Sequence, residues 1–163
     1  MEKIRNFIKS FTTEDIGKIE KIRNSYFLID KDVEKIKDKI EKNPFAAGLF
    51  LGESKKSFIP STNLLDILSK KTEKKIFVNR KTAWLFLCDR DIFGSGIEKS
   101  NAKKGLVLVQ NDRDENLGYG EIIAELTQKD KVVVKNLFDR GNFLRRERNN
   151  SKKEVKKWQK KEK

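Results

Sequence analysis

The sequence predicts an α+β protein with two domains and a basic tail, on the strength of three observations. Apolar residues recur at helical spacing through much of the first half. Short apolar runs separated by glycines dominate the second half, as in a small curved β-barrel. The polar stretch Ser69–Glu73 divides the two halves. We therefore predict an α+β domain over residues 1–73, a barrel-like domain over residues 74–148 and a basic tail over residues 149–163.

The first half is expected to hold four helices. The first covers residues 2–11, the second begins after Thr12 or Thr13, the third begins at Asp30 or Asp32 and ends at Asn43-Pro44, and a short fourth begins at Pro60-Ser61. Their apolar positions are Ile4, Phe7, Ile8 and Phe11 in the first, Ile16, Ile19 and Ile22 in the second, Val33, Ile36 and Ile40 in the third, and Leu64, Leu65, Ile67 and Leu68 in the fourth.

Strands are expected between these helices and throughout the second half. In the first half they cover residues 26–29, 45–51 and 57–59, with a turn at Gly52-Glu53-Ser54 between the last two. In the second half they cover residues 75–78, 105–109, 117–124 and 131–134, and a helix capped by Asn79 follows the first of these. The run over residues 105–109 does not alternate, so we expect both of its faces to be buried.

The composition excludes several kinds of chemistry. The chain has no histidine and one cysteine, Cys88, so histidine-based catalysis, a structural zinc centre and an internal disulfide are ruled out. We expect no cofactor and no metal. The apolar runs are too short to span a bilayer, and charges interrupt the N-terminus where a signal peptide would be apolar, so we expect a cytoplasmic protein without membrane contact.

The positive charge is concentrated at the C-terminus. Residues 144–163 contain ten Lys and Arg against three Glu, which is +7 of the total formal charge of +13. A basic terminus on a nearly balanced body indicates a polyanionic partner, with nucleic acid as the first candidate.

Four sequence motifs in the second half resemble those of PUA domains and occur in the same order. Residues 76–85 are similar to their first strand and helix, residues 91–97 to the loop that follows, and residues 117–120 to their Leu-Gly-aromatic-Gly strand. Residues 139–147 are similar to the closing strand of archaeal versions. The resemblance implies a PUA-type pseudo-β-barrel that binds RNA.

The preceding segment narrows the resemblance. Residues 48–52, 58–61 and 64–68 look like the small α/β pre-PUA domain of the Nip-seven family of ribosome-biogenesis factors. That family implies a non-catalytic role in maturation of the large ribosomal subunit, with RNA on the PUA domain and other assembly proteins on the N-terminal domain. One departure from the family pattern is Asp89, where a glycine is expected after Cys88.

The candidate RNA-binding residues form two groups. The first is Arg145, Arg146, Arg148, Lys152 and Lys153, whose guanidinium and ammonium groups suit phosphate oxygens. On a closing strand, alternation would place Arg146 and Arg148 on one face and Arg145 on the other. The alternative is a solvated strand in which Glu147 neutralises one arginine. The second group is Gly94, Ser95 and Gly96, whose backbone N–H groups could cradle a phosphate, although a plain turn is also possible.

Other residues receive structural interpretations. Asp89 and Asp91 are expected to stabilise their loop rather than hold Mg²⁺. Trp84 and its neighbours are expected in the core, because the run around it is purely apolar. In the tail, Val155 and Trp158 could dock on the body, or Trp158 could stack on a base.

Two alternatives to the RNA-binding factor stay open. One is a PUA-bearing RNA-modification enzyme or its accessory subunit, although the first domain shows no nucleotide-binding motif and no nucleophile–base pair. The other is a basic adaptor that binds protein or an anionic membrane surface through its tail. The sequence does not identify the RNA element, the partner protein or the oligomeric state.

Overall fold

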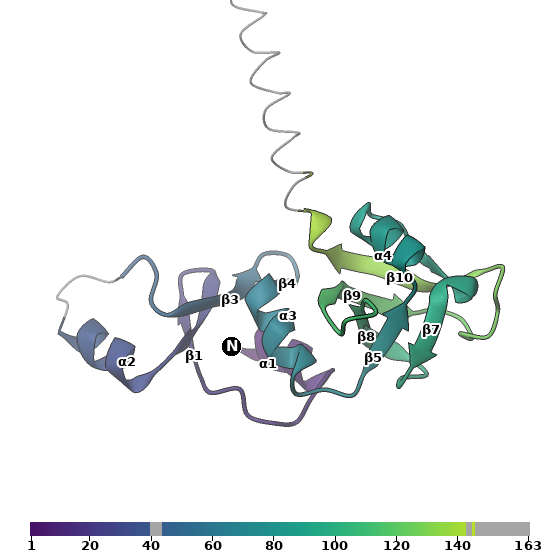
Figure 1. Cartoon of the computed structure of the whole chain (residues 1–163). Helices are drawn as coiled ribbons and strands as arrows, with labels where there is room; N and C mark the ends of the chain where they lie inside the picture. The colour runs from purple at the N-terminus through teal and green to yellow at the C-terminus, as the bar shows by residue number, and fades with distance from the viewer. Residues whose placement is uncertain (40–43, 143–144, 146–163) are drawn as a thin grey trace, which may run out of the picture.

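The computed structural model describes residues 1–39, 44–142 and 145. Its N-terminal part contains a four-stranded antiparallel sheet of order β1-β2-β3-β4, with α1 and α3 packed against it and α2 lying apart from them (Figure 1). The elements in chain order are α1 (Glu2–Lys9), β1 (Lys18–Ile22), β2 (Ser25–Ile29), α2 (Lys31–Asp38), β3 (Leu49–Ser54), β4 (Phe58–Pro60) and α3 (Thr62–Ser69).

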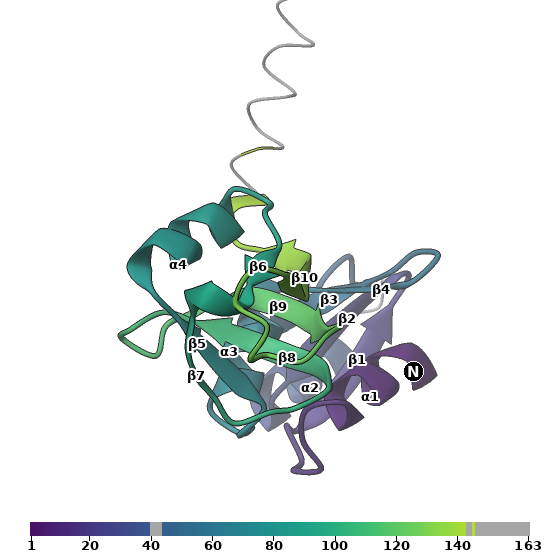
Figure 2. The same cartoon turned by 90° about the vertical axis from the view of Figure 1, so that its right-hand side faces the viewer.

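The C-terminal part is a curled six-stranded sheet of order β6-β10-β9-β8-β5-β7 with one helix against it (Figure 2). Its elements are β5 (Lys75–Val78), α4 (Arg80–Leu87), β6 (Ile92–Phe93), the 3₁₀ turn η1 (Gly94–Gly96), β7 (Ile97–Ser100), β8 (Gly105–Gln110), β9 (Asn116–Ile122) and β10 (Val132–Asp139). The β5–β8 pair is parallel and the remaining pairs of this sheet are antiparallel. This mixed sheet confirms the predicted α+β class with a pseudo-barrel.

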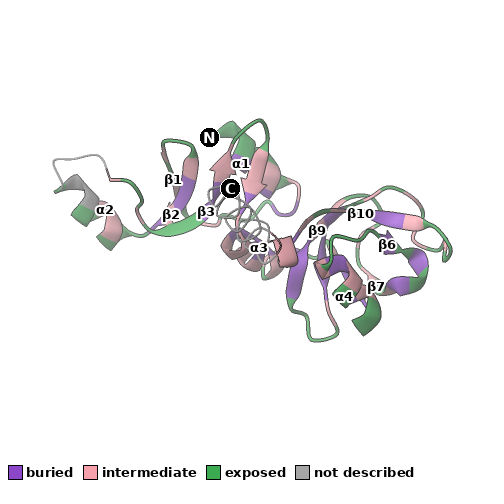
Figure 3. Ribbon diagram, turned by 90° about the horizontal axis from the view of Figure 1, so that it is seen from above, coloured by how far each residue is buried: buried purple, intermediate pink, exposed green. Residues whose placement is uncertain are grey.

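Two hydrophobic cores meet at β8. Val107 and Val109 point into the core of the curled sheet, whereas Leu108 points into a second core with α1, α3 and the four-stranded sheet. All three side chains are fully buried, which confirms burial of both faces for residues 107–109, whereas Gly105 is exposed and Leu106 is partly buried. Tyr119 of β9 also belongs to the second core, so that core combines side chains from both halves of the chain. Figure 3 shows buried residues on both sides of this junction.

The predicted starts of the helix at Pro60-Ser61 and of the helix capped by Asn79 are both present. The Ser61 side chain accepts the N–H of Leu64 at the start of α3, and the Asn79 side chain accepts the N–H of Thr82 at the start of α4. Each cap satisfies one of the backbone donors that a helix start leaves free. The sequence therefore located the start of both helices.

The predicted helix after Thr12 or Thr13 is wrong. Residues 18–22 form strand β1, which pairs in register with β2 through the two-residue turn Arg23-Asn24. Isoleucines three residues apart do fit a helix, but Gly17 adopts φ +103°, which a helix cannot contain. Ile19 instead lies opposite Leu28 and packs into the second core.

One turn and two strands differ from the predictions. Gly52-Glu53-Ser54 lies within β3, and the turn to β4 falls at residues 55–57. Strands β6 and β7 were not predicted, because each is short and neither alternates clearly. α2 is described to Asp38, and the predicted end at Asn43 lies outside the described residues together with Ile40.

Among the described residues, no helix is long and apolar enough to cross a bilayer.

Candidate nucleic-acid interface

Helix α4 has a buried face and an exposed face. Ala83 and Phe86 belong to the core of the curled sheet, while Arg80, Lys81 and Trp84 point to solvent. The Trp84 side chain is 65% exposed, so its predicted place in the core is wrong. The reason is helical periodicity: Trp84 lies three residues beyond Lys81 on one face, and its apolar neighbours in sequence lie on the other.

A cleft of about 330 Å³ lies between α4 and the η1 turn. Phe93, the last residue of β6, lines this cleft and is 49% exposed. The lining residues are Asn79, Lys81, Thr82, Leu85, Asp91, Phe93, Ser95 and Gly96. An exposed aromatic ring and an ammonium group therefore share one concave surface, with Trp84 on the helix that forms its wall.

Two of the three backbone donors of the predicted phosphate cradle in η1 are bonded within the protein. The Gly94 N–H donates to the carbonyl of Lys131 at 3.1 Å, and the Ser95 N–H donates to the carbonyl of Lys129 at 3.0 Å. A Cβ on Gly94 would lie 2.5 Å from a backbone oxygen of Gln128. Gly94 is thus needed for close packing, and the backbone donors of Gly94 and Ser95 are already used.

Gly96 has the same structural role on the other side of the turn. A Cβ there would lie 2.2 Å from the Thr82 hydroxyl, so the glycine lets η1 approach α4. Gly96 and the exposed side chain of Ser95 both line the cleft, and their predicted RNA contacts stay predictions.

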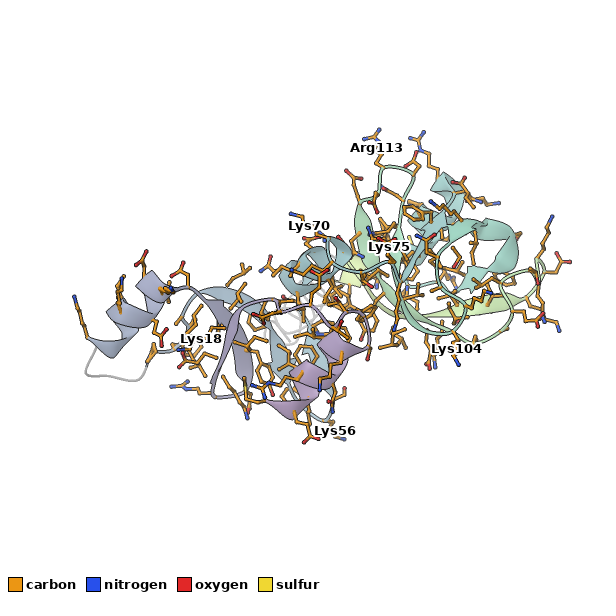
Figure 4. The ribbon with its side chains drawn as sticks, turned by 90° about the horizontal axis from the view of Figure 1, so that it is seen from below. Lys18, Lys56, Lys70, Lys75, Lys104 and Arg113 are labelled. Carbon is orange, nitrogen blue, oxygen red and sulfur yellow. The ribbon has the colours of Figure 1, made fainter. Side chains whose placement is uncertain are left out.

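Cations flank this cleft. The backbone bonds just described bring exposed Lys129 and Lys131 beside the η1 turn, and Lys81 lines the cleft from α4. Elsewhere the cations are dispersed: Figure 4 shows Lys18, Lys56 and other labelled cations spread over both halves of the molecule. Charge alone therefore marks no site among the described residues, whereas charge beside exposed aromatic rings marks the α4–η1 cleft. We call the cleft-lining residues Lys81, Phe93 and Ser95, together with Trp84 on the exposed face of α4, the cleft surface.

Arg145 is held by internal partners at the opposite end of α4. Its guanidinium donates to the Asp139 carboxylate at 2.6 and 3.0 Å and to the carbonyl of Leu87, the last residue of α4. The Asp89 carboxylate lies 3.8 Å away. The hydrogen bond that Arg145 donates to Asp139 raises the pKa of Arg145 above its ordinary value, so the guanidinium stays charged.

The predicted strand placement of Arg145 is also wrong. β10 ends at Asp139, and Gly141, Asn142 and Arg145 have helical geometry. Asp139 is 1% exposed, so Arg145 neutralises a carboxylate that would otherwise be buried with its charge unpaired. This pairing gives Arg145 a structural role, and its role as a phosphate contact stays a prediction.

The aspartates before β6 stabilise their loop. Asp89 adopts φ +68°, the left-handed geometry for which the family pattern has glycine. Asp91 accepts the N–H of Asn136 at 2.8 Å. Within the described residues, no group of three metal-binding side chains comes together.

The remaining predicted contacts lie outside the described residues. These are Arg146, Arg148, Lys152 and Lys153, along with the alternative partner Glu147 and the tail residues Val155 and Trp158. Their predicted roles stay predictions.

The fold is similar to that of a known PUA-domain protein. A structure of similar fold is that of a conserved PUA domain protein from Thermoplasma acidophilum, with a TM-score of 0.56 and 12% identity over 86% of this chain and 88% of that one. At this identity the likeness concerns the fold.

Sequence comparison gives a match to one family. Residues 74–148 match the model of the UPF0113 PUA domain. A UPF0113 protein from Archaeoglobus fulgidus is 34% identical over 116 residues. That alignment covers 66% of this chain and 66% of the relative, so the match spans just under two thirds of its length.

Proposed function

We propose that this protein is a cytoplasmic, non-catalytic RNA-binding factor that acts in rRNA maturation during assembly of the large ribosomal subunit. RNA is held by the PUA domain, and other assembly proteins dock on the N-terminal part. The specific role follows the resemblance to the Nip-seven family, and RNA binding is the typical property of PUA domains.

The observation that carries the proposal is the exposed Trp84 ring on α4, three residues from Lys81, which lines a cleft together with Phe93. Exposed aromatic rings are the stacking surfaces that proteins use for unpaired bases, and ammonium groups one helical turn away suit the phosphates between those bases. At 65% exposure, most of the Trp84 ring is accessible to a ligand. The cleft surface accounts for both its exposure and its neighbours.

The proposed mechanism combines stacking with charge. A base stacked on Trp84 contributes about 1–3 kcal/mol, irrespective of its identity. Lys81, Lys129 and Lys131 then contact the ribose–phosphate backbone on either side, and the basic C-terminal residues extend this contact. Such an interface binds single-stranded segments with little sequence preference and with affinity that falls as salt rises.

The test replaces Trp84 with alanine and measures binding of fluorescent single-stranded rRNA fragments by anisotropy. Loss of stacking should weaken binding roughly 5- to 150-fold, which corresponds to about 1–3 kcal/mol. Ile36→Ala is the matched control, because Ile36 is 61% exposed on α2, outside the PUA domain. Equal affinity of the Trp84→Ala and Ile36→Ala variants would remove the cleft surface from the RNA interface.

The non-catalytic part of the proposal has its own test. The purified protein is incubated with large-subunit rRNA transcripts, with and without nucleotide and methyl donors, and the RNA is analysed by mass spectrometry. The proposal expects no mass change. A modified or cleaved nucleotide would favour the alternative of a PUA-bearing modification enzyme.

A further inference from the structure

A second concave surface lies on the N-terminal part, between α1 and β1. Its volume is about 460 Å³, and its apolar side chains are Ile8 of α1, Ile16 of the connecting loop and Ile19 of β1. Arg5 and Lys9 of α1 form the wall opposite β1. The groove thus lies between α1 and the edge strand β1 of the four-stranded sheet.

That last strand leaves its outer edge open. β1 pairs with β2 on one side, and the four-stranded sheet begins at β1, so no described strand covers its other side. An open edge is a template for a further strand, and cells use this mode of recognition widely. The edge lies beside the groove because Ile19 belongs to both.

The turn geometry identifies the free backbone groups. Ile22 and Ser25 flank a two-residue turn, so they form the hydrogen-bonded pair that closes the hairpin. Hydrogen-bonded and non-bonded pairs alternate in an antiparallel ladder, so the pairs of Ile19 and Lys21 are non-bonded. The N–H and C=O groups of Ile19 and Lys21 therefore point outward from the edge.

The charges beside this edge favour an acidic partner. Arg5, Lys9 and Lys21 are exposed, and no side-chain partner accompanies them within the described part of the chain. Of the acidic residues on the groove, Glu14 is paired with Lys71 at 3.0 Å, which leaves Asp15 as the opposing charge. A second copy of this chain is a less suitable partner. It would place its own Lys21 near the same edge, and its net charge of +13 would repel the first copy.

We propose that β1 is a docking edge for an extended, acidic segment of a partner protein, which adds a fifth strand to the sheet. Its backbone pairs with Ile19 and Lys21, one of its aliphatic side chains enters the groove on Ile8 and Ile16, and its carboxylates face Arg5 and Lys9. This inference specifies the protein docking contained in the proposed function and is independent of RNA binding.

The test uses a fluorescent eight-residue peptide of alternating valine and glutamate, with a valine–lysine peptide as the charge control. Binding to the full-length protein is measured by anisotropy, and amide shifts are followed by NMR. The glutamate peptide should bind and shift the amides of Ile19 and Lys21, and the lysine peptide should not. Absence of binding, equal binding of both peptides or shifts confined to the PUA domain would overturn the proposal.

The decisive variant is Lys21→Pro, which removes an outward N–H without removing a bond to β2. It should weaken peptide binding at least tenfold, whereas Lys21→Ala keeps the N–H and should weaken it about two- to threefold through the lost charge. Equal affinity of both variants would show that no strand is added at β1. Light scattering tests whether a second copy of the chain binds at β1 instead. If the protein were a dimer and Lys21→Pro made it a monomer, the choice of a partner protein would be overturned.

RNA affinity is measured on the same variants. It should stay unchanged in Lys21→Pro, because β1 lies in the N-terminal part and the cleft surface lies in the PUA domain. Loss of peptide binding with intact RNA binding separates this inference from the RNA-binding proposal.

Discussion

The outer face of α4 and its C-terminal end carry residue types that commonly bind RNA, yet the structure treats them differently. On the outer face, Trp84 is exposed beside Lys81. At the C-terminal end, Arg145 is bound to Asp139 and to the carbonyl of Leu87. The difference lies in the available acceptors: a buried carboxylate and a free helix carbonyl hold the arginine, and the tryptophan has no such neighbour.

This comparison shows why charge and aromaticity are insufficient to identify an interface. A cation that neutralises a buried carboxylate contributes to folding, and using it for RNA would expose an unpaired charge. A large ring left in solvent has a hydration cost that binding can relieve. Substitutions on the outer face of α4 and at its C-terminal end should therefore have different effects on stability and on RNA binding.

The largest effect is expected for Arg145→Ala. Removing the guanidinium leaves the Asp139 carboxylate unpaired at 1% exposure, which should lower the free energy of unfolding by about 3–5 kcal/mol in urea denaturation. Arg140→Ala is the control, because its ion pair with Asp66 is half-exposed and should cost at most about 1 kcal/mol. If Arg145→Ala instead lowered RNA affinity at unchanged stability, the arginine would be an RNA contact.

A smaller effect is expected from removal of residues 149–163. The deletion removes Lys152 and Lys153, so the slope of log affinity against log salt should become shallower by about 1.4, at roughly 0.7 per phosphate contact on single strands. Stability should not change in thermal unfolding. An unchanged slope would restrict RNA contacts to the PUA domain, and complete loss of binding would favour the basic adaptor.

A single cation of the cleft surface should change the slope by half as much. Lys81→Ala should reduce it by about 0.7, while Trp84→Ala should weaken binding equally at all salt concentrations and leave the slope unchanged. Anisotropy titrations over a range of salt concentrations measure both. The assignment of stacking to Trp84 and charge to Lys81 would be wrong if the two variants altered the slope alike.

The smallest effect concerns the shared core, where burial raises the pKa of Tyr119 above its ordinary value of 10.0. A raised pKa in the folded state gives a stabilising contribution that is complete below pH 10.0 and declines as the pH rises above it. Tyr119→Phe should therefore show a shallower loss of stability than the parent protein above that pH. Parallel pH profiles of unfolding would contradict the burial of a neutral phenol between the two halves.

Much of the fold could be predicted because its signals are local. The cap residues Ser61 and Asn79 located two helices, since a cap depends on the side chain and the next three residues. The unbroken apolar run of β8 indicated burial on both faces, since each face of a strand needs its own cover. The isoleucines of β1 misled, because a spacing of three fits a helix and a strand's pairing partner is remote in sequence.

The candidate site divides in the same way. The sequence showed that histidine chemistry is absent, that the C-terminus is basic and that PUA-like motifs occur in order. All three follow from residue types and their order. Only the tertiary structure decided that Trp84 faces solvent and that Asp139 binds Arg145. It also decided that the N–H groups of Gly94 and Ser95 donate to backbone carbonyls within the protein. Those outcomes depend on which distant groups meet after folding, because burial and hydrogen bonding are properties of neighbours in space.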